Sequence, residues 1–182
     1  MTSTPSVVRL AKPEDSTALF DFFVFAHIDN GFLPLSAAKV AERIILATNN
    51  QGGGIIGIIE GKNGIEATTG LMLNTVWYSD KYYLSDMLTF VHPDCRRSKH
   101  AQALIKFQKK CADNMGVQLG YKVPLVVGIT TRKSLEAKMR LFQREFTQIG
   151  GWFVYGDNSI IPEDNIQQRH INFYKAPKLV KV

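Results

Sequence analysis

The sequence predicts an α/β (α+β) fold, in which helices cover a single mixed, mostly antiparallel sheet in the order β-α-α-β-β-β-α-β-α-β-β. Three observations predict it. Segments with helical periodicity alternate with short apolar runs. The pair Asn63-Gly64 stands between two apolar runs, which is a strong signal for an antiparallel hairpin. Residues 125–130 form a short, continuously apolar run, as a buried parallel strand would.

The individual elements follow from these patterns along the chain. In chain order, we expect a strand over 7–10, helices over 16–28 and 35–48, strands over 55–60, 65–73 and 82–91, a helix over 97–115, a strand over 125–130, a helix over 134–148, and strands over 152–155 and 170–174. Ser36 is the expected N-cap of the second helix, and the glycines of 52–54 end the helical pattern after it. Gly150 and Gly151 close the last helix.

Composition narrows the class of protein. A chain of 182 residues, 45% of them hydrophobic, is expected to fold as one domain over 1–182 with a sizeable core. No apolar run approaches the length of about 18 residues that suggests a membrane span, and the N-terminus lacks the features of a signal peptide. Cys95 and Cys111 have no pairing logic and fit a reduced, cytoplasmic protein. The four histidines have no metal-ligand spacing, so we expect no metal.

Residues 84–107 carry the strongest functional signal. An apolar strand runs into a proline turn, then a cluster of basic and small residues, then a helix. Backbone N–H groups at the start of a helix have no intrahelical partner, and together with Arg96, Arg97 and Lys99 they favour a bound anion, above all a phosphate. The alternative is a surface corner that binds nothing, because strand–turn–helix corners with arginines are common.

Charge is divided unevenly between the two halves of the chain. Residues 1–95 carry a net charge of −4, and residues 96–182 carry +10. A polyanion such as coenzyme A would find a complementary field in the basic half. Nucleic acid would as well, but no helix interleaves exposed aromatic residues with arginines as a stacking platform would, so we rank it last. A solvated basic face without a partner is the remaining alternative.

The stretch 91–105 resembles motif A of the GNAT N-acetyltransferase superfamily, V-x-P-x-x-R-G-x-G-x-G/A-x-x-L. Five positions match: Val91, Pro93, Arg96, Ala101 and Leu104. Arg97 and Lys99 stand where the family has glycines, and a glycine lets the backbone approach a pyrophosphate closely. The order of elements over residues 7–156 is similar too. With two of its glycines replaced, the motif resembles that of a divergent branch of the family, of the kind that phage genomes carry.

The resemblance implies acetyl transfer from acetyl-CoA to an amine, either a protein lysine or N-terminus or a small amine. By analogy, the strand before motif A separates from the next strand near its end, and coenzyme A lies in the gap. Backbone groups of Phe90 and Val91 would bond the pantetheine arm and polarise the thioester carbonyl. The pyrophosphate would be wrapped by the amides of Arg96, Arg97, Ser98, Lys99, His100 and Ala101. A homodimer is left open.

Asp86 is the candidate general base, because it lies on the same strand as Val91 in an apolar stretch, where burial raises a carboxyl pKa. The alternative is that Asp86 faces solvent or pairs with a neighbouring strand. Glu60 and Glu66 are weaker candidates, being near the hairpin end.

The family's general acid is a tyrosine on the late helix, and here Leu141 or Phe142 replaces it. Tyr155 could substitute, and a thiol with a pKa of roughly 8.5 is itself a fair leaving group, so the acid stays unassigned. The missing glycines and tyrosine leave a second hypothesis open, a GNAT-fold protein that has lost catalysis and acts as a binding or inhibitory module.

The resemblance places the acceptor between the first two helices and the last strand pair. The candidate residues there are Phe32, Tyr78, Trp152, Tyr155 and the loop over 156–168. That loop is locally acidic, which suggests a cationic acceptor such as a lysine or a polyamine.

Overall fold

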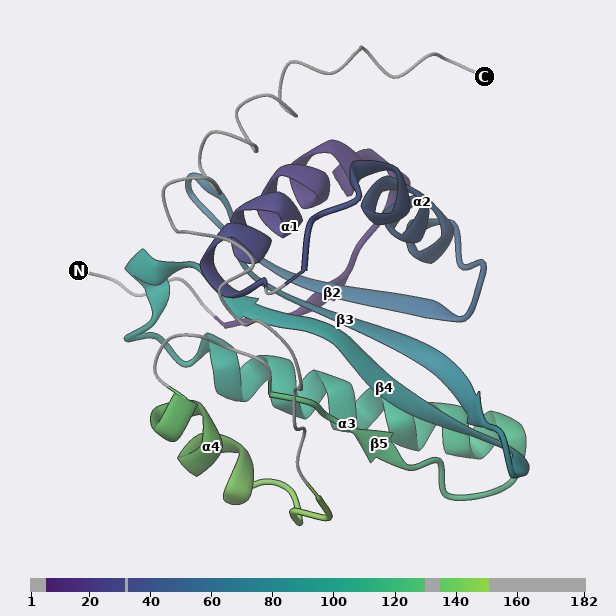
Figure 1. The fold of residues 1–182 in the computed structure, drawn as a ribbon. Coiled ribbons are helices and arrows are strands. Elements are labelled where there is room, and N and C mark those ends of the chain that lie inside the picture. The colour runs from purple at the N-terminus through teal and green to yellow at the C-terminus, as the bar shows by residue number, and fades with distance from the viewer. Residues whose placement is uncertain (1–5, 32, 130–134, 151–182) are drawn as a thin grey trace.

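The computed structural model describes residues 6–31, 33–129 and 135–150, which form one five-stranded sheet with helices on both faces (Figure 1). The elements are β1 (Arg9–Leu10), α1 (Ser16–Asn30), α2 (Ala37–Thr48), β2 (Gly54–Gly61), β3 (Gly64–Val76), β4 (Ser79–Val91), α3 (His100–Leu119), β5 (Leu125–Val126) and α4 (Leu135–Gln143), with 3-10 turns at Pro13–Asp15 and Pro93–Cys95. Strands β1 to β4 are antiparallel neighbours in sequence order, and β5 runs parallel to β4. The predicted fold class is confirmed.

The sheet separates two layers of helices. Helices α1 and α2 cover one face, and α3 lies on the other with α4 beside it (Figure 1). The alternation of β2 shows why: Ile56 and Ile58 pack against Leu19 of α1 and Ile44 of α2, whereas Ile59 packs against Leu104 of α3. Both faces of this strand are therefore buried.

Local signals in the sequence position α2 and the hairpin as expected. Ser36 is the N-cap of α2, and its hydroxyl accepts a hydrogen bond from the N–H of Lys39 at 3.4 Å. Strands β2 and β3 pair down to Gly61 with Gly64, and Gly64 has a φ of 110°, a backbone conformation that favours glycine. The predicted hairpin is confirmed.

Several element boundaries differ from the sequence prediction; β4, for example, begins at Ser79, three residues earlier than expected. Helix α3 begins at His100, three residues later than expected, because residues 96–99 form a turn, and it extends to Leu119. Strand β5 is only two residues long, with Val126 38% exposed. Helix α4 ends at Gln143, five residues earlier than expected, so the expectation that Gly150 and Gly151 close this helix is wrong. The expected strands over 152–155 and 170–174 lie outside the described residues.

Two further properties of the described residues concern the membrane and the thiols. Within 6–31, 33–129 and 135–150, no helix has both the length and the apolarity to cross a bilayer. Cys95 and Cys111 are free thiols.

Candidate active site

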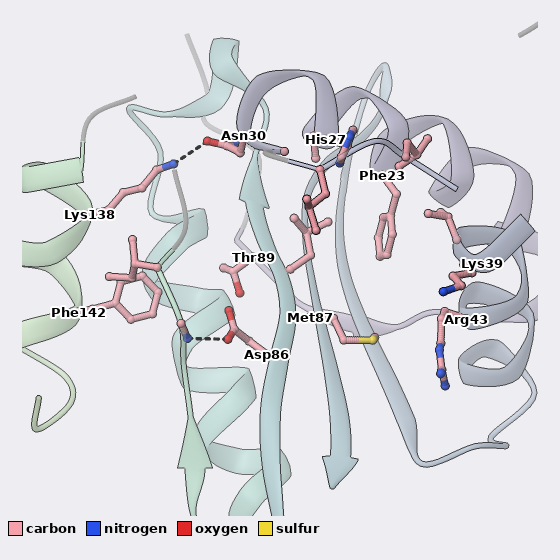
Figure 2. Close-up of a pocket in the computed structure, with 18 residues that line it drawn as sticks. Phe23, His27, Asn30, Lys39, Arg43, Asp86, Met87, Thr89, Lys138 and Phe142 are labelled. Atoms are coloured by element: carbon pink, nitrogen blue, oxygen red, sulfur yellow. Dashed lines mark hydrogen bonds between the residues drawn. The ribbon is translucent and has the colours of Figure 1, made fainter. Parts of the chain in front are cut away.

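The site begins where β4 and β5 part. The two strands pair over only two residue pairs, the last being Ser85 with Val126. Immediately beyond this pair, Asp86 Oδ1 accepts a hydrogen bond from the backbone N–H of Gly128 at 2.8 Å, so a side-chain hydrogen bond takes the place of the backbone hydrogen bonds between the strands. A cavity of about 420 Å³ lies there, with walls from α1, α2, β4, α4 and the segment after β5 (Figure 2). The splayed strands therefore open a ligand-sized space.

A bulge in β4 decides where Asp86 points. Leu71 of β3 pairs with Asp86, and the preceding Gly70 pairs with Leu88, so Met87 is the extra residue. Figure 2 shows Asp86 on the β5 side of β4 and Met87 on the side of α2. Side chains that follow one another in a regular strand point to opposite faces of the sheet, and the bulge interrupts this alternation. As a result, Asp86 and Met87 both line the cavity.

Asp86 is the carboxyl group with the properties of a base. Burial raises its pKa to about 6, although the N–H groups of Gly128 and of Asp86 itself hold it down. The competing carboxylates are engaged elsewhere: Glu60 forms an ion pair with Arg9 at 2.6 Å, and Glu66 bonds His100. The alternative that Asp86 pairs with a neighbouring strand is met in part, because its side chain accepts a hydrogen bond from Gly128, just after β5. The Asp86 side chain nevertheless lines the cavity.

A buried polar network supports the same strand from α3. Gln108 Nε2 donates to Thr69 Oγ1 at 2.7 Å and to Thr89 Oγ1 at 2.8 Å, and the two hydroxyl oxygens are 2.9 Å apart. Thr89 also lines the cavity. Gln108 is fully buried, and sequence reasoning did not identify this network. The available signal was a glutamine at helical spacing from Leu104 and Ile105, because a buried polar side chain needs polar partners.

The loop after β4 offers fewer backbone donors than expected. The N–H groups of Arg96, Ser98 and His100 are bonded within the loop, to Pro93 O, Cys95 O and Ser98 Oγ respectively. The N–H groups of Arg97, Lys99 and Ala101 donate to no acceptor among the described residues. We expected consecutive N–H groups from 96 to 101 to wrap a pyrophosphate, and only every second one is available. A turn that leads into a helix produces this pattern.

The two departures from glycine cost no backbone strain. Lys99 has a φ of −90°, and the one non-glycine residue with positive φ in the described part of the chain is Asn50, far from the loop in sequence. Arg97 and Lys99 are both exposed, so their side chains point outward. Glycine is therefore not needed for backbone conformation here.

Arg96 is held by an acidic residue from α1. Its guanidinium donates to Asp29 Oδ2 at 2.6 Å and lies over the ring of Phe90, 5.9 Å from the centroid. The Phe90 residue is 4% exposed, and its ring packs on Phe22. Phe90 pairs with Thr68 of β3, and His92 N–H bonds Glu66 O, so the antiparallel alternation turns the Phe90 backbone groups toward β3 and not toward a ligand. Strand β5 stops at Val126, so the edge of β4 from 86 to 91 has no paired strand among the described residues on that side. Alternate backbone groups there, including those near Val91, face the gap.

The His100 side chain is packed, not presented to a ligand. It is 1% exposed, with Nε2 2.8 Å from Glu66 Oε2 and Nδ1 2.9 Å from Ser6 Oγ. Cys95 completes a group whose potential metal-ligand atoms lie within 4.8 Å of one another. Burial, with the negative charge of Glu66 and Asp94, raises the pKa of the Cys95 thiol. This cluster ties the loop to β3.

The acceptor end of the cavity is built differently from the expectation. Tyr78 is 72% exposed beside Trp77, between β3 and β4, and does not line the cavity. Phe32, Trp152, Tyr155 and the loop over 156–168 lie outside the described residues. The walls on this side include Lys39 and Arg43 of α2, which sequence reasoning missed (Figure 2). Of Leu141 and Phe142, the two candidates for the position of the family's tyrosine, Phe142 lines the cavity.

Neither the protein-family models nor the curated proteins include a match to this sequence. Solved structures do match. A predicted acetyltransferase from Clostridium acetobutylicum, solved with acetyl-CoA, has a TM-score of 0.61 at 15% identity, covering 82% of this chain and 95% of that one. Glucosamine-6-phosphate N-acetyltransferase from Arabidopsis thaliana has a TM-score of 0.60 at 13% identity, covering 82% and 97%.

A GNAT family acetyltransferase from Staphylococcus aureus has a TM-score of 0.53 at 13% identity, again covering 82% of this chain and 97% of that one. At such identities the likeness is one of fold, and it spans nearly the whole of each matched chain. The fold indicated by motif A and by the order of elements is confirmed: this chain is a GNAT-fold protein.

Proposed function

We propose that the protein is an acetyl-CoA-dependent N-acetyltransferase that acetylates an amine, either on a protein or on a small molecule. The observation that carries the proposal is the position of Asp86. A carboxyl group with a pKa of about 6 lines a cavity at the point where β4 and β5 separate. The same strand leads directly into the loop with unpaired amides and three basic side chains.

The residues present fit acetyl-CoA in two places. The N–H groups of Arg97, Lys99 and Ala101, with the positive end of α3, suit a pyrophosphate. The free edge of β4 suits the pantetheine arm, and an N–H near Val91 could polarise the thioester carbonyl. The acetyl thioester supplies the reactive carbonyl carbon.

Asp86 performs the proton transfer in this mechanism. The acceptor ammonium gives one proton to the carboxylate, and the free amine then attacks the thioester carbonyl. A C–N bond forms, the C–S bond breaks, and the second proton of the amine is lost. The leaving thiolate takes up a proton to give the thiol, whose pKa of roughly 8.5 makes a dedicated acid dispensable. Phe142 contributes an apolar wall there and no proton.

A binding module without catalysis is the second candidate. Leu141 or Phe142 stands where the family has a tyrosine, and neither offers a hydroxyl. The absence of that acid favours ligand binding without turnover.

The test measures thiol release from acetyl-CoA across a panel of amines and peptides, alongside binding of coenzyme A by calorimetry. Binding with amine-dependent thiol release supports the enzyme. Binding without release for any acceptor supports the module, and no binding at millimolar ligand overturns both.

A further inference from the structure

The geometry points to an acceptor amine that carries an anionic group, a carboxylate or a phosphate, at the end remote from the amine, with Lys39 and Arg43 as its binding residues. This inference rests on the proposed function, because it names the class of substrate that the same cavity would take. It concerns the part of the cavity formed by α1 and α2, which motif A does not reach.

The cavity has two chemically distinct ends. Asp86 lies at the end where β4 and β5 part, and Lys39 and Arg43 lie on α2 across β4 from it (Figure 2). Between them the walls are largely apolar, with Phe23, Val40 and Met87 among the lining residues. A ligand that spans this space has its amine at the carboxyl end and its other end against two cations.

Nothing in the described part of the chain neutralises these two cations. Neither Lys39 nor Arg43 makes an ion pair within 4.0 Å of a described carboxylate, although Glu42 lies between them in sequence. They are four residues apart on one helix, so they share a face, where like charges destabilise the helix slightly. Two neighbouring cations on the wall of a cavity suit a divalent or bidentate anion.

Asp86 is the one carboxylate among the described lining residues. Lys138 of α4 lies on the Asp86 side of the cavity, where its ammonium donates to Asn30 Oδ1 at 3.1 Å (Figure 2). A second ammonium group on the acceptor would therefore meet Lys39 and Arg43 unfavourably. This disfavours polyamines, the cationic class that the acidic loop over 156–168 suggested.

The size of the cavity favours a small molecule. A volume of about 420 Å³ lies in the range of small-ligand sites, roughly 300–1,000 Å³. It suits a compact amine with an apolar body and one terminal anion.

The experiment uses matched acceptors with the full chain and saturating acetyl-CoA. ω-Amino acids of three to six carbons supply the carboxylate, and O-phosphoethanolamine supplies the phosphate. The neutral controls are amino alcohols, including ethanolamine, and the cationic controls are α,ω-diamines of equal length. We expect kcat/KM for the best anionic amine to exceed that of its neutral counterpart by on the order of tenfold, since exposed charge pairs contribute modestly. Which arm responds distinguishes carboxylate from phosphate.

Charge reversal makes the test specific to α2. Arg43→Glu and Lys39→Glu should invert the preference towards diamines, while Lys122→Glu, an exposed change outside the cavity, should leave it intact. Far-UV circular dichroism checks that α2 still forms, which is expected because glutamate is a good helix former.

Two results would overturn the inference: preference for neutral or cationic amines, or a preference that is unchanged in both α2 variants. If no amine turns over, the same amines are titrated into the coenzyme A complex by calorimetry. Equal binding of anionic and neutral amines, or no binding of either, would contradict the inference. Failure of the proposed function itself is seen separately, as absence of coenzyme A binding or as absence of thiol release with every amine of the panel.

Discussion

Burial raises the pKa of Asp86 to about 6. Glu60 sits beside Arg9, and Glu66 beside His100, whereas Asp86 has backbone N–H donors and no cation within ion-pair distance among the described residues. The uncompensated desolvation places its pKa near 6, where a base is ionised at neutral pH yet still takes up a proton readily.

The pH dependence of turnover tests this role. In the wild type, kcat/KM should rise with pH and level off above an inflection near pH 6, because only the ionised carboxylate accepts the proton. Asp86→Asn should lower turnover by about 10²–10⁴-fold and abolish that inflection. Binding of acetyl-CoA, followed by calorimetry, serves as the control and should be retained. Unchanged turnover in the variant would remove Asp86 from the mechanism.

The same substitution should stabilise the protein at neutral pH. The pKa of Asp86 is raised from 3.8 to about 6 in the folded state, so the ionised form opposes folding as pH rises through that interval. Asparagine keeps an acceptor for Gly128 N–H without a charge, so the free energy of unfolding at pH 8 should rise, by no more than about 3 kcal/mol. Urea unfolding of both proteins at pH 8 and pH 4 measures this. The difference should shrink at pH 4, and a destabilised variant at pH 8 would contradict the assignment of a desolvated carboxylate.

At the scale of elements, the loop between β4 and α3 is anchored by a buried side chain. His100 begins α3 and bonds Glu66 of β3 and Ser6 before β1, so three distant segments meet at one ring. This anchoring holds Arg97, Lys99 and Ala101 with their N–H groups outward. The loop is therefore shaped by tertiary contacts as well as by its own turns.

Removing that anchor should weaken both the fold and ligand binding. We expect His100→Ala to lower the free energy of unfolding by about 1–3 kcal/mol, because it leaves Glu66 without its buried partner. It should also raise the Kd for acetyl-CoA, since the loop amides lose their fixed positions. Lys99→Ala is the control, because that side chain is exposed and its loss should leave unfolding unchanged. Equal unfolding free energies and equal affinities in His100→Ala and wild type would refute the anchoring role.

At the scale of the whole molecule, β4 has one edge that no strand of the described residues covers beyond Ser85, and the basic half of the chain begins soon after β4 ends. The two strands that part there belong to segments far apart in sequence, and helices of both layers contribute to the cavity wall. A ligand bound in this gap contacts several elements at once, so its binding should stabilise the whole domain against unfolding.

Acetyl-CoA should therefore raise the melting temperature. At about 100 times its Kd, a ligand adds roughly 2.7 kcal/mol to the free energy of unfolding, and each kcal/mol is worth about 2–4 °C at this chain length. A thermal shift of about 5–10 °C is expected in the wild type. In Arg96→Ala/Lys99→Ala the ligand-induced shift should shrink, and the shift is the quantity to compare because losing the Arg96–Asp29 pair changes the unliganded protein too. No shift in the wild type would leave only the fold in common with the acetyltransferases.

The sequence by itself determined the features that local chemistry controls. Hydrophobic periodicity located every described helix and strand, the Asn63-Gly64 pair located the hairpin, and Ser36 located the start of α2. The resemblance to motif A indicated the GNAT fold. Asp86 could be singled out as a lone acid in an apolar strand. These signals lie within a few residues of what they determine.

Only the tertiary structure decided the composition of the site. The bulge that directs Asp86 into the gap arises from strand pairing, and the bond to Gly128 joins residues 42 apart in sequence. Likewise, Lys39 and Arg43 resemble ordinary surface cations in the sequence, and α2 becomes a cavity wall only when it packs against α1 and β2. Such contacts depend on long-range packing, which no local pattern encodes.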